Sequence, residues 1–204
     1  MEQIKIMDTF KSISKPATGI YKELGSKFLS FAYPVSSEEE IKNILACLRK
    51  TYFDAKHHCY AYRLGKNGEN WRASDDGEPS STGGKPILGQ LLSNELSDIL
   101  IVVVRYFGGT KLGLPGLMRA YRNAAADAVS NSEIITKTVF RQLVVHYDYL
   151  LTHEIMQSIK ESEAEIVDQC IDQNSIIRLK IKEDAFDSFC NKLSSSGATF
   201  QICD

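Results

Sequence analysis

The stretch ILIVVVRYFGGTKLGLPGLMRAYRNAAA, residues 99–126, decides the fold of this chain. Six apolar residues from Ile99 to Val104 predict a strand that is buried on both faces. A glycine-rich turn follows, and Pro115 stands where the first turn of a helix tolerates proline. The stretch contains four Lys or Arg residues and no acidic residue, so it is locally electropositive in a chain of formal net charge -2.

The composition is that of an ordinary globular protein, with 43% apolar and 25% charged residues among 204. No apolar run reaches the roughly 18 residues that a membrane span needs, and Met1 to Lys5 lacks the features of a signal peptide. We therefore expect a cytoplasmic protein with no membrane partner. The five cysteines are scattered and none forms C-x-x-C, which indicates neither a disulfide framework nor a zinc site.

The residues before the central stretch predict strands and one amphipathic helix. Residues 19–35 carry β-favouring apolar positions on both sides of Gly25, which predicts two strands separated by a turn. Ser36 and Glu39 have the spacing of a capping box, so we expect a helix to begin there. Its apolar positions, spaced for one helical stripe that packs on a sheet, are Ile41, Ile44, Leu45, Leu48 and Tyr52.

Residues 57–63 alternate as a strand does, with Cys59 and Ala61 on one side. Residues 74–85 are too rich in Gly, Ser, Pro and Asp for regular structure, so they predict a loop of functional length. Apolar residues between Ile87 and Leu92 then predict a short helix.

From Lys137 the pattern starts again in the order βαββαβ, which is the ferredoxin-like arrangement. The predicted strands are residues 138–147, 165–171, 175–181 and 199–202, and the predicted helices are residues 152–162 and 184–194. We therefore predict an α+β protein with two domains, residues 1–136 and 137–204. The second domain has 7 basic and 11 acidic residues, which argues against nucleic-acid binding through its bulk charge.

The glycine-rich junction allows two interpretations. A helix N-terminus stabilises an anion and glycine allows close approach, which favours a phosphate site. The P-loop pattern is absent, however, because Leu114 and Pro115 stand where Lys and Ser or Thr are required. The structural interpretation is a tight strand-to-helix turn with Arg105 and Arg119 in salt bridges.

The loop after residue 74 contains Asp75, Asp76 and Glu78, and carboxylates of this kind can hold Mg²⁺ for a phosphoryl or hydrolytic reaction. The alternative is structural, with one Asp capping a turn and the other pairing with a cation such as Arg105. A second acidic segment, which a usual two-metal site needs, is missing.

The His57-His58-Cys59 run does not indicate zinc, because consecutive strand residues point to opposite faces. His57 alone is weak support for a general base. Several aromatic residues could stack on bases beside Lys and Arg, although alternation also predicts some of them in the core: Tyr60, Tyr62, Trp71, Tyr106 and Phe107.

Three blocks in order, HHCYAYR at 57–63, SDDGEPS at 74–80 and RYFGGTKLG at 105–113, resemble the signature blocks of the YigZ/IMPACT family, in its bacterial two-domain form. The chain departs from the family pattern at Ser81, where glycine is usual, and at Gly83, where alanine is usual. Pro115 likewise occupies a position that is often glycine.

The resemblance implies an N-terminal domain of the superfold named after the second domain of a small-subunit ribosomal protein. It implies a C-terminal domain similar to domain V of elongation factor G. Eukaryotic relatives regulate translation by interfering with activation of the amino-acid-starvation kinase, and they share only the first domain. The family implies no established reaction for bacterial members, and the fold favours nucleic-acid or ribosome-associated binding.

We therefore predict a non-catalytic, cytosolic binding or regulatory protein of the translation or RNA machinery, with no catalytic residue, metal or cofactor. Its partner is RNA, a ribosome-associated factor or another protein, and the oligomeric state stays open. The candidate binding residues are Asp75, Asp76, Glu78, Lys85, Arg105, Tyr106, Gly108, Gly109, Lys111, Gly113 and Arg119. The alternatives are an enzyme or phosphate-ligand binder that uses the junction and Mg²⁺ in the acidic loop, and a protein-interaction module that uses the C-terminal sheet.

Overall fold

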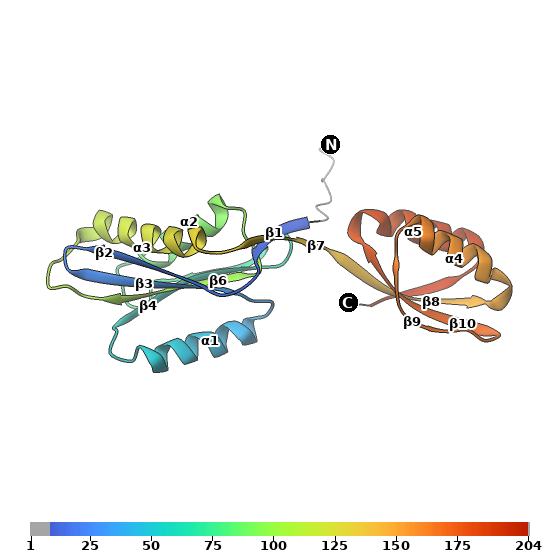
Figure 1. The fold of residues 1–204 in the computed structure, drawn as a ribbon, viewed down its shortest axis with the longest axis horizontal. Helices are drawn as coiled ribbons and strands as arrows, with labels where there is room; N and C mark the ends of the chain where they lie inside the picture. Colours follow the sequence, from blue (N-terminus) through green and yellow to red (C-terminus); the bar gives the residue numbers. More distant parts are fainter. Residues whose placement is uncertain (1–8, 204) are drawn as a thin grey trace. The chain divides into compact units, whose positions relative to one another are not determined.

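The computed structural model describes residues 9–203, so the sequence features of Met1 to Lys5 lie outside the described residues. The chain divides into two compact units, one of residues 10–137 and one that begins at Thr138 (Figure 1). Each unit has its own hydrophobic core and an antiparallel sheet. The predicted α+β character is confirmed, with helices and antiparallel sheets in two groups.

The N-terminal unit is built on a five-stranded sheet with the order β2-β3-β6-β4-β5. The strands are β2 (Ala17–Glu23), β3 (Ser26–Pro34), β4 (His57–Leu64), β5 (Asn70–Ser74) and β6 (Ile99–Tyr106). β6 is the central strand, and its residues Ile99 to Val104 are fully buried, as the sequence predicts. The strand runs two residues further than the apolar run, so Arg105 and Tyr106 belong to its end.

Helices cover both faces of this sheet (Figure 1). α2 (Gly84–Ser93) and α3 (Gly113–Ser130) pack on one face, where α3 contributes Tyr121 and several alanines to the larger core. α1 (Glu38–Thr51) packs on the other face through its predicted apolar stripe. Because α2 begins at Gly84, Lys85 lies in a helix and not in the preceding loop, contrary to the prediction.

The cap of α1 is shifted by one residue from its predicted position. The hydroxyl of Ser37, not Ser36, accepts a hydrogen bond from the Glu40 amide at 3.2 Å. The Glu40 carboxylate accepts in return from the Ser36 amide at 2.7 Å. The sequence SSEEE fits the capping pattern in two registers, so the pattern alone selects neither.

A separate two-stranded sheet pairs β1 (Thr9–Ile13) with β7 (Ile134–Thr138). The sequence pattern does not indicate this ribbon and instead predicts one long strand from Thr138. The chain instead ends β7 at Thr138 and begins a new strand, β8, at Phe140.

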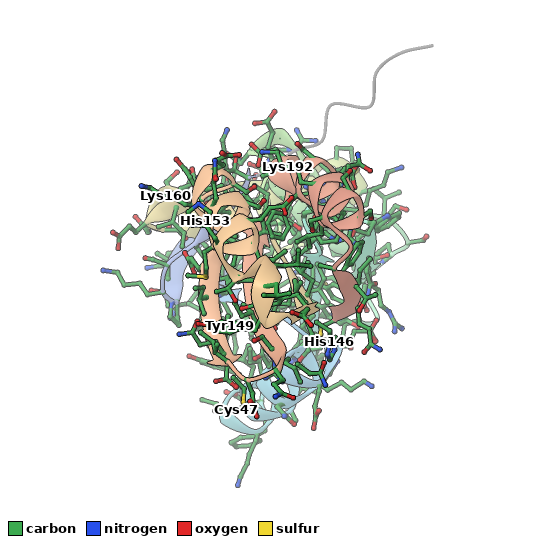
Figure 2. The ribbon with its side chains drawn as sticks, turned by 90° about the vertical axis from the view of Figure 1, so that its right-hand side faces the viewer. Cys47, His146, Tyr149, His153, Lys160 and Lys192 are labelled. Carbon is green, nitrogen blue, oxygen red and sulfur yellow. The ribbon has the colours of Figure 1, made fainter. Side chains whose placement is uncertain are left out.

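The second unit follows the predicted order βαββαβ, with a four-stranded antiparallel sheet of order β11-β8-β10-β9. Its elements are β8 (Phe140–Asp148), the 3-10 turn η1 (Tyr149–Leu151), α4 (Thr152–Glu161), β9 (Glu165–Cys170), β10 (Asn174–Lys182), α5 (Glu183–Ser196) and β11 (Thr199–Cys203). Figure 2 looks onto the helices of this unit, with His153 and Lys160 on α4 and Lys192 on α5. Lys192 joins the two helices through an ion pair with Glu161 at 2.8 Å.

None of the helices within residues 9–203 combines the length with the apolar character that a membrane-spanning segment needs.

Candidate functional site

A pocket of about 640 Å³ lies in the N-terminal unit, at the junction between β6 and α3. Arg105 and Tyr106 contribute from the end of β6, and Gly113 contributes from the start of α3. β4 pairs with β6 so that His57 lies opposite Arg105, which brings the segment before β4 to the same place. The apolar wall consists of Pro79, Phe107, Leu112, Leu114 and Leu117.

The buried part of the pocket contains an ion pair. Arg105 Nη1 donates to a carboxylate oxygen of Glu78 at 2.6 Å, and both side chains are buried. The hydroxyl of Tyr121 donates to the same oxygen at 2.8 Å. A buried ion pair is tolerated only when further hydrogen bonds satisfy its members, and Tyr121 supplies one of these. The cluster therefore fixes the loop that holds Glu78 to β6 and α3.

Arg105 keeps unused hydrogen-bond donors. Its Nε is buried without an acceptor, and no described residue accepts from Nη2. The guanidinium carbon lies 5.5 Å from the ring centroid of Phe28 and 5.6 Å from that of Phe107, which stabilises the cation through the faces of the rings. Arg105 is thus held in place while part of its hydrogen-bonding capacity stays unused.

Burial keeps the nearby Cys59 and Tyr121 uncharged. The Cys59 thiol donates to the carbonyl oxygen of Asp75 at 3.0 Å. Burial raises the pKa of the Cys59 thiol and also raises the pKa of the Tyr121 phenol. Because the nucleophilic form of cysteine is the thiolate, Cys59 is not an activated nucleophile at neutral pH.

The carboxylates of the acidic loop are used for structure. Asp75 accepts from the backbone amides of Ser81 and Gly83 at 2.8 Å each and from that of Gly84 at 2.9 Å, so it caps the start of α2. Asp76 binds a cation, as one of the two acids was expected to do. The cation is Arg49 at 2.6 Å and not Arg105, because Glu78 holds Arg105.

Burial opposes the ionisation of Asp76, but hydrogen bonds from Arg49 and from the His58 amide hold the pKa of Asp76 below its usual value. Asp75, Asp76 and Glu78 therefore face three different sets of partners. Within residues 9–203 no group of three His, Cys, Asp or Glu side chains is arranged to hold a metal ion. The geometry gives no support to a Mg²⁺ site in this loop.

The glycines of the junction serve backbone packing. A Cβ on Gly108 would lie 1.9 Å from the carbonyl carbon of Gly25, so the two backbones touch. Gly109 and Gly113 have φ values of 90° and 69°, which glycine adopts without strain. These requirements explain the glycine-rich sequence without a ligand.

The first turn of α3 is open toward the pocket. Leu112 occupies its N-cap position and provides no side-chain hydrogen bond. No described residue accepts from the backbone amides of Gly113 and Leu114, both of which line the pocket. Free amides at a helix N-terminus carry a partial positive charge that attracts anions.

The charges that line the pocket without an ion-pair partner among the described residues are two lysines and one aspartate, so their sum is positive. Lys56 and Lys111 line it, and neither forms an ion pair or a hydrogen bond with another described residue. Of the two acids, Glu78 is paired with Arg105, whereas Asp54 accepts from the neutral Tyr106 hydroxyl at 2.8 Å and keeps its negative charge. The hydrogen bond to Asp54 raises the pKa of Tyr106.

Five of the predicted site residues line this pocket: Glu78, Arg105, Tyr106, Lys111 and Gly113. Gly108 and Gly109 belong to the same turn and shape it. The others lie elsewhere, since Asp75 and Asp76 bind the partners described above, Lys85 is exposed on α2, and Arg119 forms a salt bridge with Glu23. Arg105 and Arg119 thus both form salt bridges.

Asp54, Lys56, Pro79 and Leu114 also line the pocket and are not among the predicted site residues. Pro79 lies in the acidic loop and Leu114 in the first turn of α3, both in segments that the sequence singled out. Asp54 and Lys56 carry no motif, and they reach the pocket because they precede β4, which pairs with β6. His57, which was considered as a base, lines the pocket with Nδ1 at 2.9 Å from the carbonyl oxygen of Asp76.

The fold and the pocket define a two-unit α+β protein that carries a cation-lined binding pocket at a strand-turn-helix junction. The family model of the Impact N-terminal domain matches residues 24–129, which include every residue that lines the pocket. The chain belongs to the IMPACT family, and the family resemblance of its three sequence blocks is confirmed.

Several relatives match most of the chain. The IMPACT family member YvyE of Bacillus subtilis is 36% identical over 138 residues, which are 68% of this chain but 64% of that protein, less than two thirds of its length. An IMPACT family member of Haemophilus influenzae is 33% identical over 85% of both chains. YigZ of Escherichia coli is 27% identical over 92% of this chain and 93% of its own.

A solved crystal structure, described as that of a hypothetical protein, has a TM-score of 0.72 and 26% sequence identity to this chain. The match covers 98% of this chain and 99% of the other. The two-unit arrangement of elements is therefore shared along nearly the whole length of both proteins.

Proposed function

We propose that this chain is a non-catalytic RNA-binding protein of the translation machinery, and that its N-terminal unit binds single-stranded RNA at the pocket. One observation carries the proposal: the pocket combines an apolar, partly aromatic wall with unpaired charges whose sum is positive, from Lys56 and Lys111 against Asp54. Its volume of about 640 Å³ lies in the range that holds a small ligand or part of a larger one.

Single-stranded RNA fits this lining better than a duplex does. Unstacked bases pack on aromatic side chains, and Phe107 is exposed at the pocket. Lys56 and Lys111 can contact the phosphates on either side of a bound base. Because the whole chain has a formal net charge of -2, its affinity depends on this local site and not on a basic surface.

We also propose two domains, residues 1–136 and 137–204, in a cytoplasmic protein. The division of contacts after Lys137 supports this boundary. The order βαββαβ and the strand order β11-β8-β10-β9 support a ferredoxin-like C-terminal domain, similar to domain V of elongation factor G. Likewise, we assign the N-terminal domain to the ribosomal-protein second-domain superfold.

A fluorescence anisotropy titration with a labelled ten-nucleotide single-stranded RNA tests the proposal at several salt concentrations. Two or three phosphate contacts predict a slope of log K against log salt of about -1.4 to -2, since each contact on a single strand contributes about 0.7. In the double variant Lys56→Gln and Lys111→Gln, binding should lose most of this dependence on salt, because both cationic side chains are removed. Phe107→Ala weakens binding by about 1 to 3 kcal/mol per lost stacking contact.

The matched control is the double variant Lys42→Gln and Lys50→Gln, which removes the same charge from exposed positions on α1. It is expected to bind RNA as the unchanged protein does. Equal losses in the pocket variant and the control variant would refute binding at the pocket. The absence of salt-sensitive RNA binding by the unchanged protein would refute the proposal itself.

Protein binding through the C-terminal sheet is a second candidate, favoured by its edge strand β9. All six residues of β9 are exposed, including Ile166 and Val167. An exposed edge strand can pair with an extended segment of another protein. Val167→Lys should then reduce co-sedimentation with purified ribosomes while it leaves RNA anisotropy unchanged. Unchanged co-sedimentation would count against this surface.

A further inference from the structure

We propose that the pocket receives the end of an RNA strand and holds a terminal phosphomonoester against Arg105 and the first turn of α3. The inference rests on the proposed RNA binding and adds which part of the RNA is recognised.

The pocket has an exposed mouth and a buried floor. Phe107 and Leu114 are 58% and 56% exposed, whereas Leu117 and Arg105 are only 6% and 8% exposed. Arg105 therefore lies deep, below a mouth formed by apolar side chains. An internal phosphodiester continues in both directions and needs a groove with two exits. A terminal phosphate enters end-on and can reach a guanidinium that is nine-tenths buried.

Two groups that line the pocket have unused donors. Arg105 lines the pocket, and neither its Nε nor its Nη2 donates to any described residue. The amides of Gly113 and Leu114, at the start of α3, also lack acceptors among the described residues. The helix end and the guanidinium are independent features of the chain, and both offer donors to the same pocket. A phosphomonoester supplies three oxygens that can accept from both.

The charge of the pocket also favours a monoester. Glu78 already binds Arg105 and Tyr121, so this cluster adds little net charge. Lys56 and Lys111 together outweigh the single negative charge of Asp54, and the end of α3 adds about half a positive charge, so a positive excess remains. A phosphomonoester carries a charge of about -1.5 to -2 at neutral pH, which matches this excess better than the single charge of a diester.

The experiment compares RNAs of one ten-nucleotide sequence that differ only in their ends. One carries a 5′-phosphate, one carries a 3′-phosphate, one has hydroxyls at both ends, and one is circular. Inorganic phosphate and a nucleoside monophosphate serve as competitors. Each linear RNA carries the same fluorescent label at an internal nucleotide, and its anisotropy measures binding to the protein. The circular RNA is unlabelled, and its affinity is measured by competition for the same site.

One of the end-phosphorylated RNAs should bind about 10-fold more tightly than the hydroxyl-ended RNA, because its additional charge meets both lysines and the helix end. The RNA that gains affinity, with either the 5′-phosphate or the 3′-phosphate, identifies the end that the pocket recognises. The gain should disappear in the Lys56→Gln and Lys111→Gln variant and persist in the Lys42→Gln and Lys50→Gln control. All these lysines are exposed, so each variant is expected to keep its thermal unfolding midpoint.

Equal binding of all four RNAs, including the circle, would overturn end recognition and leave the proposed RNA binding intact. Binding of none of the four would overturn both. A phosphate-dependent gain that survives the removal of Lys56 and Lys111 would contradict the match of charge between the phosphate and the pocket, and it would also overturn the inference.

Discussion

Gly83 packs closely against Cys59 beneath the acidic loop, so a larger residue at position 83 is expected to destabilise the fold. A Cβ on Gly83 would lie 2.6 Å from the Sγ of Cys59 and 3.0 Å from its Cβ. Cys59 is fully buried in the core beside α2 and α3, so its thiol has little room to move. The φ of Gly83 is -109°, which alanine adopts freely. The cost of Gly83→Ala is therefore a packing cost and not backbone strain.

Overpacking a well-filled core costs about 1 to 3 kcal/mol of folding free energy. Alanine returns about 0.4 to 1 kcal/mol by restricting the unfolded chain, so the expected net loss lies between about 0 and 2.6 kcal/mol. Cys59→Ala alone should cost about 1 kcal/mol, because it empties the space of one sulfur atom and loses a weak hydrogen bond to the Asp75 carbonyl. In the double variant the new methyl group enters the emptied space, so its cost should be less than the sum.

Urea unfolding followed by tryptophan fluorescence measures all three variants. Trp71 is the only tryptophan of the chain and lies in β5, so its signal reports on the N-terminal unit. A double-mutant cycle should give a coupling free energy of about 1 kcal/mol or more between positions 59 and 83. Costs that add within about 0.5 kcal/mol would refute the contact, because residues without a shared contact behave additively.

Three further predictions concern the surroundings of the pocket. Ser81 has a φ of 63°, which strains a serine backbone but not a glycine backbone. Because glycine also makes the unfolded chain more flexible, Ser81→Gly should raise the free energy of unfolding in urea by only about 0.5 to 1 kcal/mol. Tyr121→Phe should lower it by about 2 kcal/mol in the same assay, because Glu78 loses a buried hydrogen bond. Burial and the nearby Arg49 lower the pKa of His58 below 6.5, so unfolded chains bind a proton there that native chains do not. Stability should therefore fall as the pH drops below about 6.5, and His58→Gln should flatten this fall in urea unfolding curves measured between pH 7.5 and 5.

The elements of the fold follow closely from the sequence. Ile99 to Val104 are apolar without alternation, which identified the central strand before any pairing was known. The helices and strands after Thr138 have clear periods of 3.6 and 2, and their predicted bounds lie within a few residues of those observed. The ribbon of β1 and β7 was missed because its strands are short and no apolar alternation sets them apart.

The partners of the charged residues could not be read from the sequence. Asp75, Asp76 and Glu78 stand close together in the chain, yet they bind backbone amides, Arg49 and Arg105, respectively. The separation of these acids along the sequence does not indicate which partner each one binds, because the partners depend on how the loop passes beside β4 and beneath α3. The two departures from the family pattern have local consequences of the same kind. Ser81 occupies a backbone conformation that suits glycine, and Gly83 stands where a methyl group would meet Cys59.

At the junction of residues 99–126, the packing of the glycine backbone and the proposed binding of an anion are hard to separate by sequence alone. Gly108 is required because its backbone touches that of Gly25, and Gly109 and Gly113 are required by their positive φ values. None of these requirements involves a ligand, so the glycines are no measure of phosphate binding. The proposed binding of an anion rests instead on groups without partners among the described residues: Lys56, Lys111, the unused donors of Arg105 and the open end of α3. Since Lys56 lies outside the glycine-rich stretch, this capacity depends on the pairing of β4 with β6 as much as on the stretch itself.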